Sequence, residues 1–147
     1  MNGNSTTDDG ADNIDTGVGE FIVFGGGGSD DIAGESQHSN NIVIGDSGVA
    51  NFLHIGAAVF AQATAGVNSG DDVISIVGND NYVFGGLGDD DITGLGSGHL
   101  VVVGDTGSVY YNDPEAILVA SNDIAGAGGD DSITTGSGPD FVIGGLG

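Results

Sequence analysis

The chain has 147 residues, of which 22 are Asp or Glu and none is Lys or Arg, so its formal net charge is −22. Without these cationic side chains it has nothing to meet the phosphates of a nucleic acid or an anionic membrane surface, which disfavours both as partners. The length fits one domain, the lack of cysteine excludes disulfide bonds, and no apolar run is long enough to span a membrane.

Short apolar clusters rich in β-branched residues recur along the chain and predict strands. In chain order they are FIVFG at 21–25, NIVIG at 41–45, YVFGG at 82–86, LVVVG at 100–104 and FVIGG at 141–145. An acidic chain with few aromatic residues is often disordered, and that alternative applies best to the protein without bound cations. The regularity of the clusters favours an all-β fold.

The glycine-rich segments follow a nine-residue frame, in which position six is usually Asp and position eight is aliphatic. The full frame fits GGGGSDDIA at 25–33, GGLGDDDIT at 85–93 and TGSGPDFVI at 135–143. Its last part fits GADNI at 10–14, GDDVI at 70–74 and GDDSI at 129–133. A fixed period in so much glycine argues against low complexity and for a repeat architecture.

The nine-residue frames are themselves part of a longer sequence repeat. VFGGGGSDDIAG at 23–34 returns 60 positions later as VFGGLGDDDITG, and GDSG at 45–48 returns 59 positions later as GDTG. We therefore expect a single repeat domain over 1–147, with blocks at about 8–69 and 70–129 and an incomplete block at 130–147.

One unit of loop and short strand cannot bury its inward aliphatic residue alone, whereas stacked units can. The pattern predicts an all-β, right-handed parallel β-roll (β-solenoid) in which two units make one coil, with a strand in each of two sheets and a loop at each of two edges, A and B. The inward residues of this thin core are the aliphatic side chains at position eight: Ile14, Val23, Ile32, Val43, Ile74, Val83, Ile92, Val102, Ile133 and Val142.

These residues resemble the RTX, or haemolysin-type, calcium-binding repeat G-G-x-G-x-D-x-U-x. The resemblance implies a parallel β-roll that binds several Ca²⁺ ions between successive loops, through the aspartates at position six and through loop carbonyl groups. The composition agrees, because hard oxygen donors without sulfur suit Ca²⁺ better than a transition metal. The loop glycines expected to take part are Gly26, Gly28, Gly86 and Gly88.

The expected metal ligands are unevenly divided between the edges. On edge A, Asp12 aligns with Asp30 and Asp72 aligns with Asp90, each pair one 18-residue coil apart. Position six on edge B is Phe21, then Asn81, and only in the third block Asp140, with Asn122 as a partner one coil earlier. We therefore expect ions to crowd edge A.

Further acidic residues complete the expected sites. Asp46 and Asp105, in the two GDxG loops, fall on edge A, where we expect them to cap the sites at Asp30 and Asp90. Asp131 and Asp140 offer half-built sites to a following coil. An isolated aspartate is as readily a turn residue, which is the interpretation for Asp8, Asp9, Asp113 and Asp123.

The strands after edge B carry apolar residues on both faces, so their sheet needs an outer cover. The irregular segments 49–66 and 108–125 can provide it in part, or another molecule can. These segments are either hairpins, with turns near 54–56 and 112–115, or wider coils that continue the solenoid; the second alternative is favoured, giving three coils per block.

Nothing in the chain predicts catalysis. The carboxylates lie in repeated loops and not in a unique pocket, and His38, His54 and His99 do not align in the long repeat. We expect a calcium-binding structural module of an extracellular or cell-surface protein, of the adhesin, surface-layer or filament type, which associates with copies of itself through its ends or its apolar sheet. The alternative is an accessory domain of a secreted enzyme or toxin that folds on calcium outside the cell.

Overall fold

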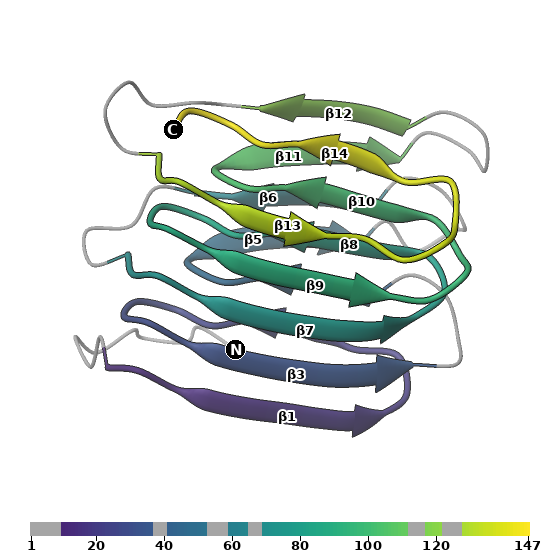
Figure 1. Ribbon diagram of the computed structural model, residues 1–147, viewed down its shortest axis with the longest axis horizontal. Helices are drawn as coiled ribbons and strands as arrows, with labels where there is room; N and C mark the ends of the chain where they lie inside the picture. The colour runs from purple at the N-terminus through teal and green to yellow at the C-terminus, as the bar shows by residue number, and fades with distance from the viewer. Residues whose placement is uncertain (1–9, 37–40, 53–58, 65–68, 112–116, 122–127) are drawn as a thin grey trace.

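The computed structural model describes residues 10–36, 41–52, 59–64, 69–111, 117–121 and 128–147. These residues form 14 strands joined by turns and loops, arranged in three sheets (Figure 1). None of the described residues lies in a helix that could cross a membrane. The prediction of an all-β protein is confirmed.

Two of the sheets are parallel and have five strands each. Sheet A contains, in spatial order, β1 (Asn13–Val18), β3 (Asp31–Ser36), β7 (Val73–Gly78), β9 (Asp91–Leu95) and β13 (Ser132–Thr134). Sheet B contains β2 (Ile22–Phe24), β4 (Asn41–Ile44), β8 (Asn81–Phe84), β10 (Leu100–Val103) and β14 (Phe141–Ile143).

The chain alternates between the two parallel sheets, so that one strand of each makes a tier. Tiers 1 to 5 are β1 with β2, β3 with β4, β7 with β8, β9 with β10, and β13 with β14. The predicted stacking of the aliphatic residues is confirmed by the register, which aligns Ile32 with Ile74 in sheet A and Val43 with Val83 in sheet B. These residues meet between the sheets in a first core that excludes water, since all four are almost fully buried.

The third sheet, sheet D, is antiparallel and consists of two hairpins. Strands β5 (Gly48–Phe52) and β6 (Val59–Ala63) form the first, β11 (Gly107–Tyr111) and β12 (Ile117–Ser121) form the second, and β6 pairs with β11. The favoured prediction of wider coils was therefore wrong, and each block has two tiers instead of three. The predicted turns at 54–56 and 112–115 lie outside the described residues.

The physical reason for the hairpins is the apolar outer face of sheet B. A second core lies between sheets B and D, in which Ile42, Ile44, Phe84 and Val103 meet Val109 of β11. Phe84 is 0 % exposed, so this part of the apolar sheet is not available for contact with other molecules. The chain thus covers most of this face itself, although Phe24 of tier 1 and Phe141 of tier 5 remain exposed.

Each long repeat adds equally to all three sheets. The block that begins with β3 contributes two strands to sheet A, two to sheet B and two to sheet D, and the block that begins with β9 does the same. Both hairpins are inserted at the same place, in the connection that leads from sheet B back to sheet A. This connection runs along edge A, where the acidic loops lie.

Candidate metal-binding edge

Edge A carries a column of aspartates, one in each tier, just before the strands of sheet A. We call Asp12, Asp30, Asp72, Asp90 and Asp131 the inner ladder. The Oδ1 atom of each member from Asp30 onward accepts a hydrogen bond from the backbone N–H of the member in the preceding tier, at 2.8 to 3.0 Å. The column joins the two predicted pairs, Asp12 with Asp30 and Asp72 with Asp90, into one continuous row.

Glycine makes this edge possible because the loops from sheet B to sheet A need backbone conformations that other residues rarely adopt. In the loop before β3, Gly26 and Gly28 have φ of 124° and 105°, and in the loop before β9, Gly86 and Gly88 have φ of 132° and 130°. A side chain at these φ values is strained. The four loop glycines singled out in the sequence therefore set the path that brings the aspartates inward.

The second carboxylate oxygen of the inner ladder has no partner. Asp30, Asp72 and Asp90 are only 1 to 2 % exposed, and the Oδ2 atoms of these three and of Asp131 are buried without a hydrogen bond. A buried polar atom left unsatisfied costs about 1–3 kcal/mol, and a charged one costs more. Four such atoms in register are a repeated feature, not an isolated packing fault.

Each unpaired oxygen lies close to a backbone carbonyl oxygen of the next loop along edge A. A Cβ added to Gly85 would clash with both the Oδ2 atom of Asp90 and the carbonyl oxygen of Gly104. The same arrangement recurs at Gly25 (Asp30 and Gly45), Gly45 (Asp72 and Gly85) and Gly104 (Asp131 and Gly144). We call these four spaces oxygen cradles. In each, two hydrogen-bond acceptors converge. The Oδ2 atom accepts no hydrogen bond, whereas the carbonyl oxygens of Gly45, Gly85 and Gly104 each accept one from a backbone N–H.

Burial makes the charged form of these carboxyl groups unfavourable. It raises the pKa of Asp90 to about 8 and that of Asp72 to about 7, and neighbouring carboxylates of the ladder add to the shift. Burial likewise raises the pKa of Asp131 to about 6, and it raises the pKa of Asp30. Without a cation the ladder therefore favours bound protons, which is the behaviour expected of anionic groups that lack counter-charges.

Asp46 and Asp105 connect the base of each hairpin to the next loop. The Oδ2 atom of Asp46 accepts a hydrogen bond from the N–H of Leu87 at 2.7 Å, and Asp105 accepts from the N–H groups of Leu146 and Gly129. Burial raises the pKa of Asp46 to about 6, and its Oδ1 atom is buried without a partner. Both residues lie on edge A as expected, but at least Asp105 is held by backbone amides that need no ion.

The donor set of the cradles fits a hard divalent cation. Carboxylate and carbonyl oxygens are the ligands that Ca²⁺ prefers, and a cation between them would satisfy the unpaired Oδ2 atom and use the second lone pair of the carbonyl oxygen. Among the described residues, no three His, Asp or Glu side chains converge as a metal-binding group. Each cradle instead offers one carboxylate together with backbone carbonyl oxygen, so further ligands have to come from other carbonyls or water.

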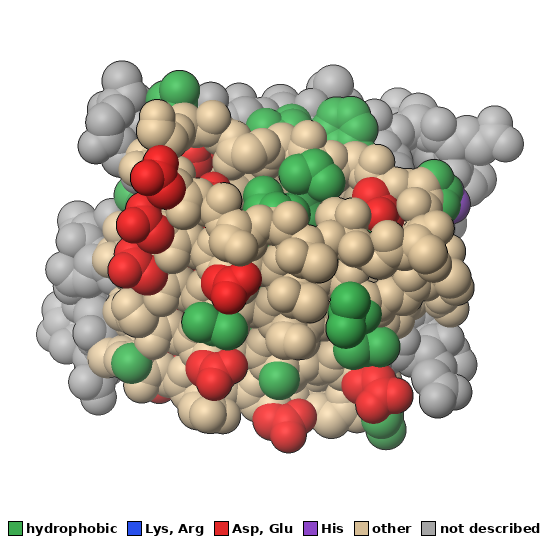
Figure 2. All heavy atoms as spheres, viewed as in Figure 1, with side chains coloured by type: hydrophobic (Ala, Val, Ile, Leu, Met, Phe, Trp, Pro, Cys, Tyr) green, Lys and Arg blue, Asp and Glu red, His purple; other side chains and the backbone are tan. Residues whose placement is uncertain are grey.

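A second row of aspartates, Asp71, Asp89 and Asp130, lies outside the inner ladder, one position before its last three members. Here the hydrogen bonds run the other way: the Oδ1 atom of Asp71 accepts from the N–H of Asp89, and that of Asp89 accepts from the N–H of Asp130, at 3.0 and 2.8 Å. These residues are exposed, and Figure 2 shows acidic side chains in a column along one side of the molecule with no Lys or Arg nearby. Water can solvate this outer row.

At edge B, side-chain amides connect neighbouring tiers where edge A has aspartates. The register aligns Phe21, Asn41, Asn81, Leu100 and Asp140 at position six. The Oδ1 atom of Asn41 accepts from the N–H of Phe21 at 3.1 Å, and its Nδ2 atom donates to Oδ1 of Asn81 at 2.7 Å. An asparagine brings its own donor, so this ladder needs no cation.

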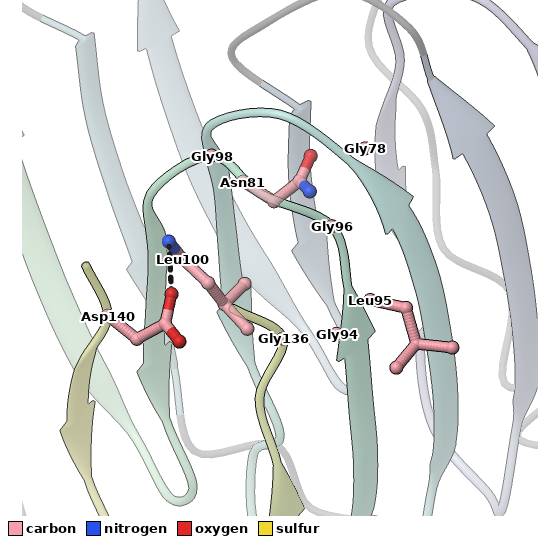
Figure 3. Close-up of a pocket in the computed structure, with 9 residues that line it drawn as sticks. All are labelled: Gly78, Asn81, Gly94, Leu95, Gly96, Gly98, Leu100, Gly136 and Asp140. Carbon is pink, nitrogen blue, oxygen red and sulfur yellow. Dashed lines mark hydrogen bonds between the residues drawn. The ribbon is translucent and has the colours of Figure 1, made fainter. Parts of the chain in front are cut away.

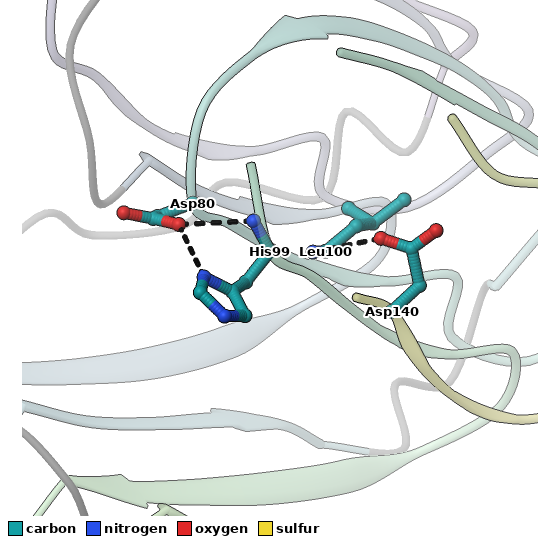
Figure 4. A network of polar contacts seen from close by, with 4 residues as sticks. All are labelled: Asp80, His99, Leu100 and Asp140. Carbon is teal, nitrogen blue, oxygen red and sulfur yellow. Dashed lines mark hydrogen bonds and ion pairs between the residues drawn. The ribbon is translucent and has the colours of Figure 1, made fainter. Parts of the chain in front are cut away.

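At edge B, two aspartates accept hydrogen bonds from residues at the start of β10. Asp140 accepts from the N–H of Leu100 at 3.2 Å, and Asp80 accepts from the N–H and faces the Nδ1 atom of His99, both at 3.0 Å (Figure 4). The His99 side chain is 66 % exposed, so this contact adds little stability. These groups do not form a shared cluster.

A small cavity lies beside Leu100 and Asp140 (Figure 3). Its volume is about 10 Å³, and it is lined by Gly78, Asn81, Gly94, Leu95, Gly96, Gly98, Leu100, Gly136 and Asp140. That volume accommodates about one water molecule. The cavity is too small for an organic substrate.

The sequence interpretation missed Asn41, although it lies two positions before the inward Val43, where position six belongs. Asp12 is at the exposed start of the inner ladder, and its N–H donates to Asp30. Other residues considered from the sequence, namely Asn122, His38, His54, Asp8, Asp9, Asp113 and Asp123, lie outside the described residues.

Comparison with known proteins adds no relative. No family model matches the chain, and no curated protein or solved structure matches it either.

Proposed function

We propose that the chain is a calcium-binding structural repeat module, in which the parallel sheets form a right-handed β-roll made rigid by Ca²⁺ along edge A. The observation that carries the proposal is the row of four cradles, each with a buried, unpaired Oδ2 atom facing a carbonyl oxygen. Asp30, Asp72, Asp90 and Asp131 would hold the ions together with carbonyl oxygens of the adjoining glycines. The bound ions would supply the positive charge that this chain lacks.

An extracellular or cell-surface location fits this chemistry. Calcium sites of extracellular modules typically have dissociation constants of about 10⁻⁴–10⁻³ M, which matches a site with one carboxylate per tier. A chain with a net charge of −22 would repel itself in the compact state until cations bind. Calcium would therefore control when the module becomes rigid, and the resemblance to RTX repeats supports the same proposal.

The direct test is calcium titration of the chelated protein, followed by circular dichroism and ion counting. We expect a gain in β-sheet signal, a higher melting temperature and binding of several ions per chain. Magnesium serves as the control, because it demands a smaller octahedral site and keeps its water. If the β-sheet signal and the melting temperature are the same in chelator and in millimolar calcium, the proposal is wrong.

A further inference from the structure

The hairpin layer does not reach the first tier. In tier 2, Ile42 and Ile44 on the outer face of β4 are 2 % and 0 % exposed, because sheet D covers them. Their register partners on β2, Ile22 and Phe24, are 42 % and 38 % exposed. Sheet D thus covers the outer face of sheet B in tier 2 but leaves this face exposed to solvent in tier 1.

The reason is that sheet D ends at β5. A Cβ added to Gly48 of β5 would meet the side chain of Ile44, and Ala50 packs on the second core, so β5 lies over tier 2. β5 pairs with β6 on one side, and no described strand pairs with it on the other side. An open backbone edge therefore borders the bare side chains of Ile22 and Phe24.

The second block shows which kind of strand pairs with the equivalent edge of its own hairpin. β11 occupies in its block the place that β5 occupies in the first, since Gly107 follows Gly48 by 59 positions. β11 is paired on both sides: with β12 of its own hairpin, and with β6, the second strand of the preceding hairpin, through Ser108 opposite Gln62. The missing neighbour of β5 should therefore resemble the second strand of a hairpin.

We propose that the free edge of β5 and the outer face of β2 form a docking groove for one extended strand supplied by another molecule. The strand would pair antiparallel with β5 through backbone hydrogen bonds, as β6 pairs with β11, and its inward side chains would cover Ile22 and Phe24. The occupant is an uncharged, mainly apolar strand similar in composition to β12, ILVAS at 117–121. A charged side chain over Ile22 and Phe24 would lose its hydration without a partner, and an acidic strand would be repelled by the chain.

The test uses a fluorescent peptide that carries AILVAS, residues 116–121, with an uncharged polar tag, titrated with the whole chain in millimolar calcium. We expect saturable binding by fluorescence anisotropy, and slower hydrogen exchange confined to the backbone amides of β5. The peptide AILPAS, with proline in place of Val119, should bind at least tenfold more weakly, since proline cannot donate a hydrogen bond to the neighbouring strand.

Variants of the chain locate the groove. Phe24→Asp should weaken binding of the peptide at least tenfold, whereas Val73→Asp, which changes an equally exposed apolar residue on the outer face of sheet A, should leave it unchanged. Ile22→Asp provides a second test of the floor if Phe24→Asp fails to fold. No saturable binding, or equal binding by these variants, would overturn the proposal. So would association of the whole chain with itself, seen by sedimentation and lost in Phe24→Asp, because a second copy, pairing through its own β5 or β12, would then be the occupant.

Discussion

Replacing Asp90 by Asn tests whether the oxygen cradles need a positive charge. The substitution keeps Oδ1 as the acceptor for the N–H of Asp72 and replaces the unpaired Oδ2 atom by an N–H₂ group. That group would face the carbonyl oxygen of Gly104, so a donor would meet an acceptor where two acceptors now converge. The variant would copy at edge A the amide ladder that Asn41 and Asn81 make at edge B.

The magnitude follows from the pKa of Asp90. Without calcium, burial raises this pKa to about 8, so folding at pH 7 requires the carboxyl group to take up a proton that it would otherwise release. Against an ordinary value of 3.8, this costs up to about 4 kcal/mol. Asparagine has no such cost, and its new hydrogen bond contributes about 1 kcal/mol. We expect Asp90→Asn to stabilise the calcium-free protein by about 2–4 kcal/mol.

In calcium the same variant should lose its advantage. An ion present at 100 times its dissociation constant stabilises the folded state by about 2.7 kcal/mol, and the variant forfeits this contribution at its own cradle. The assay is urea unfolding of both proteins in chelator and in saturating calcium, with ion counting. Asp91→Asn is the matched control, because it removes the same charge from an exposed neighbour outside the ladder.

The expected signature is loss of the advantage: the variant is more stable than the wild type in chelator, and about equally stable in calcium with fewer ions bound. A variant that is less stable than the wild type in chelator would refute the reasoning about the cradles. Identical behaviour of Asp90→Asn and Asp91→Asn would show that only net charge matters.

Three further predictions follow from the same contacts. Because the ladder carboxyl groups have raised pKa values, the folded state without calcium binds more protons than the unfolded state, so its melting temperature should rise as the pH falls from about 8 towards 4; in saturating calcium this rise should vanish or reverse. Gly85→Ala places a methyl group in a cradle, so it should lower the free energy of unfolding by about 1–3 kcal/mol and reduce ion binding. A Cβ at Gly144 meets nothing within 4 Å, so Gly144→Ala should change neither quantity, and equal losses in the two variants would contradict the cradle geometry. Phe84→Asp should destabilise the fold by more than about 3 kcal/mol, because it buries a charge in the second core, while Phe24→Asp at an exposed position should cost less than about 1 kcal/mol; urea unfolding measures both, and a tolerated Phe84→Asp would disprove the covering role of sheet D.

The parallel sheets were predictable because their signal is local and repeated. An aliphatic residue two positions after an aspartate, in frame after frame, fixes both the inward side and the register, and Ile32 and Ile74 stack as expected. The alignment of the inner ladder followed from the same spacing. These features depend on one nine-residue unit and its copies, so a single sequence suffices.

The hairpins were not predictable from length. A segment of 18 residues equals one full coil, and apolar stretches such as AAVFA suit a hairpin strand as well as a coil strand. What decides between them is the apolar outer face of sheet B, which needs a cover two strands high for every two tiers. This cover depends on packing between segments far apart in the chain, which the local sequence of either segment does not indicate.

The ladder at edge B shows a different limit. Asn41 occupies position six of its unit, but an asparagine there does not match the carboxylate expected of a calcium ligand. The structure shows that the amide serves as a replacement, since Asn41 donates to Asn81 at 2.7 Å. An asparagine at position six therefore predicts an edge whose side-chain ladder is stable without bound ions.

The equal contribution of each block to all three sheets has a consequence for mechanical reach. Two strands per sheet advance the stack by only about 9–10 Å, while the 60 residues that supply them would measure about 200 Å when pulled straight. Such blocks span little distance for their mass. A block that unfolded under a pulling force, however, would extend to roughly twenty times its folded height.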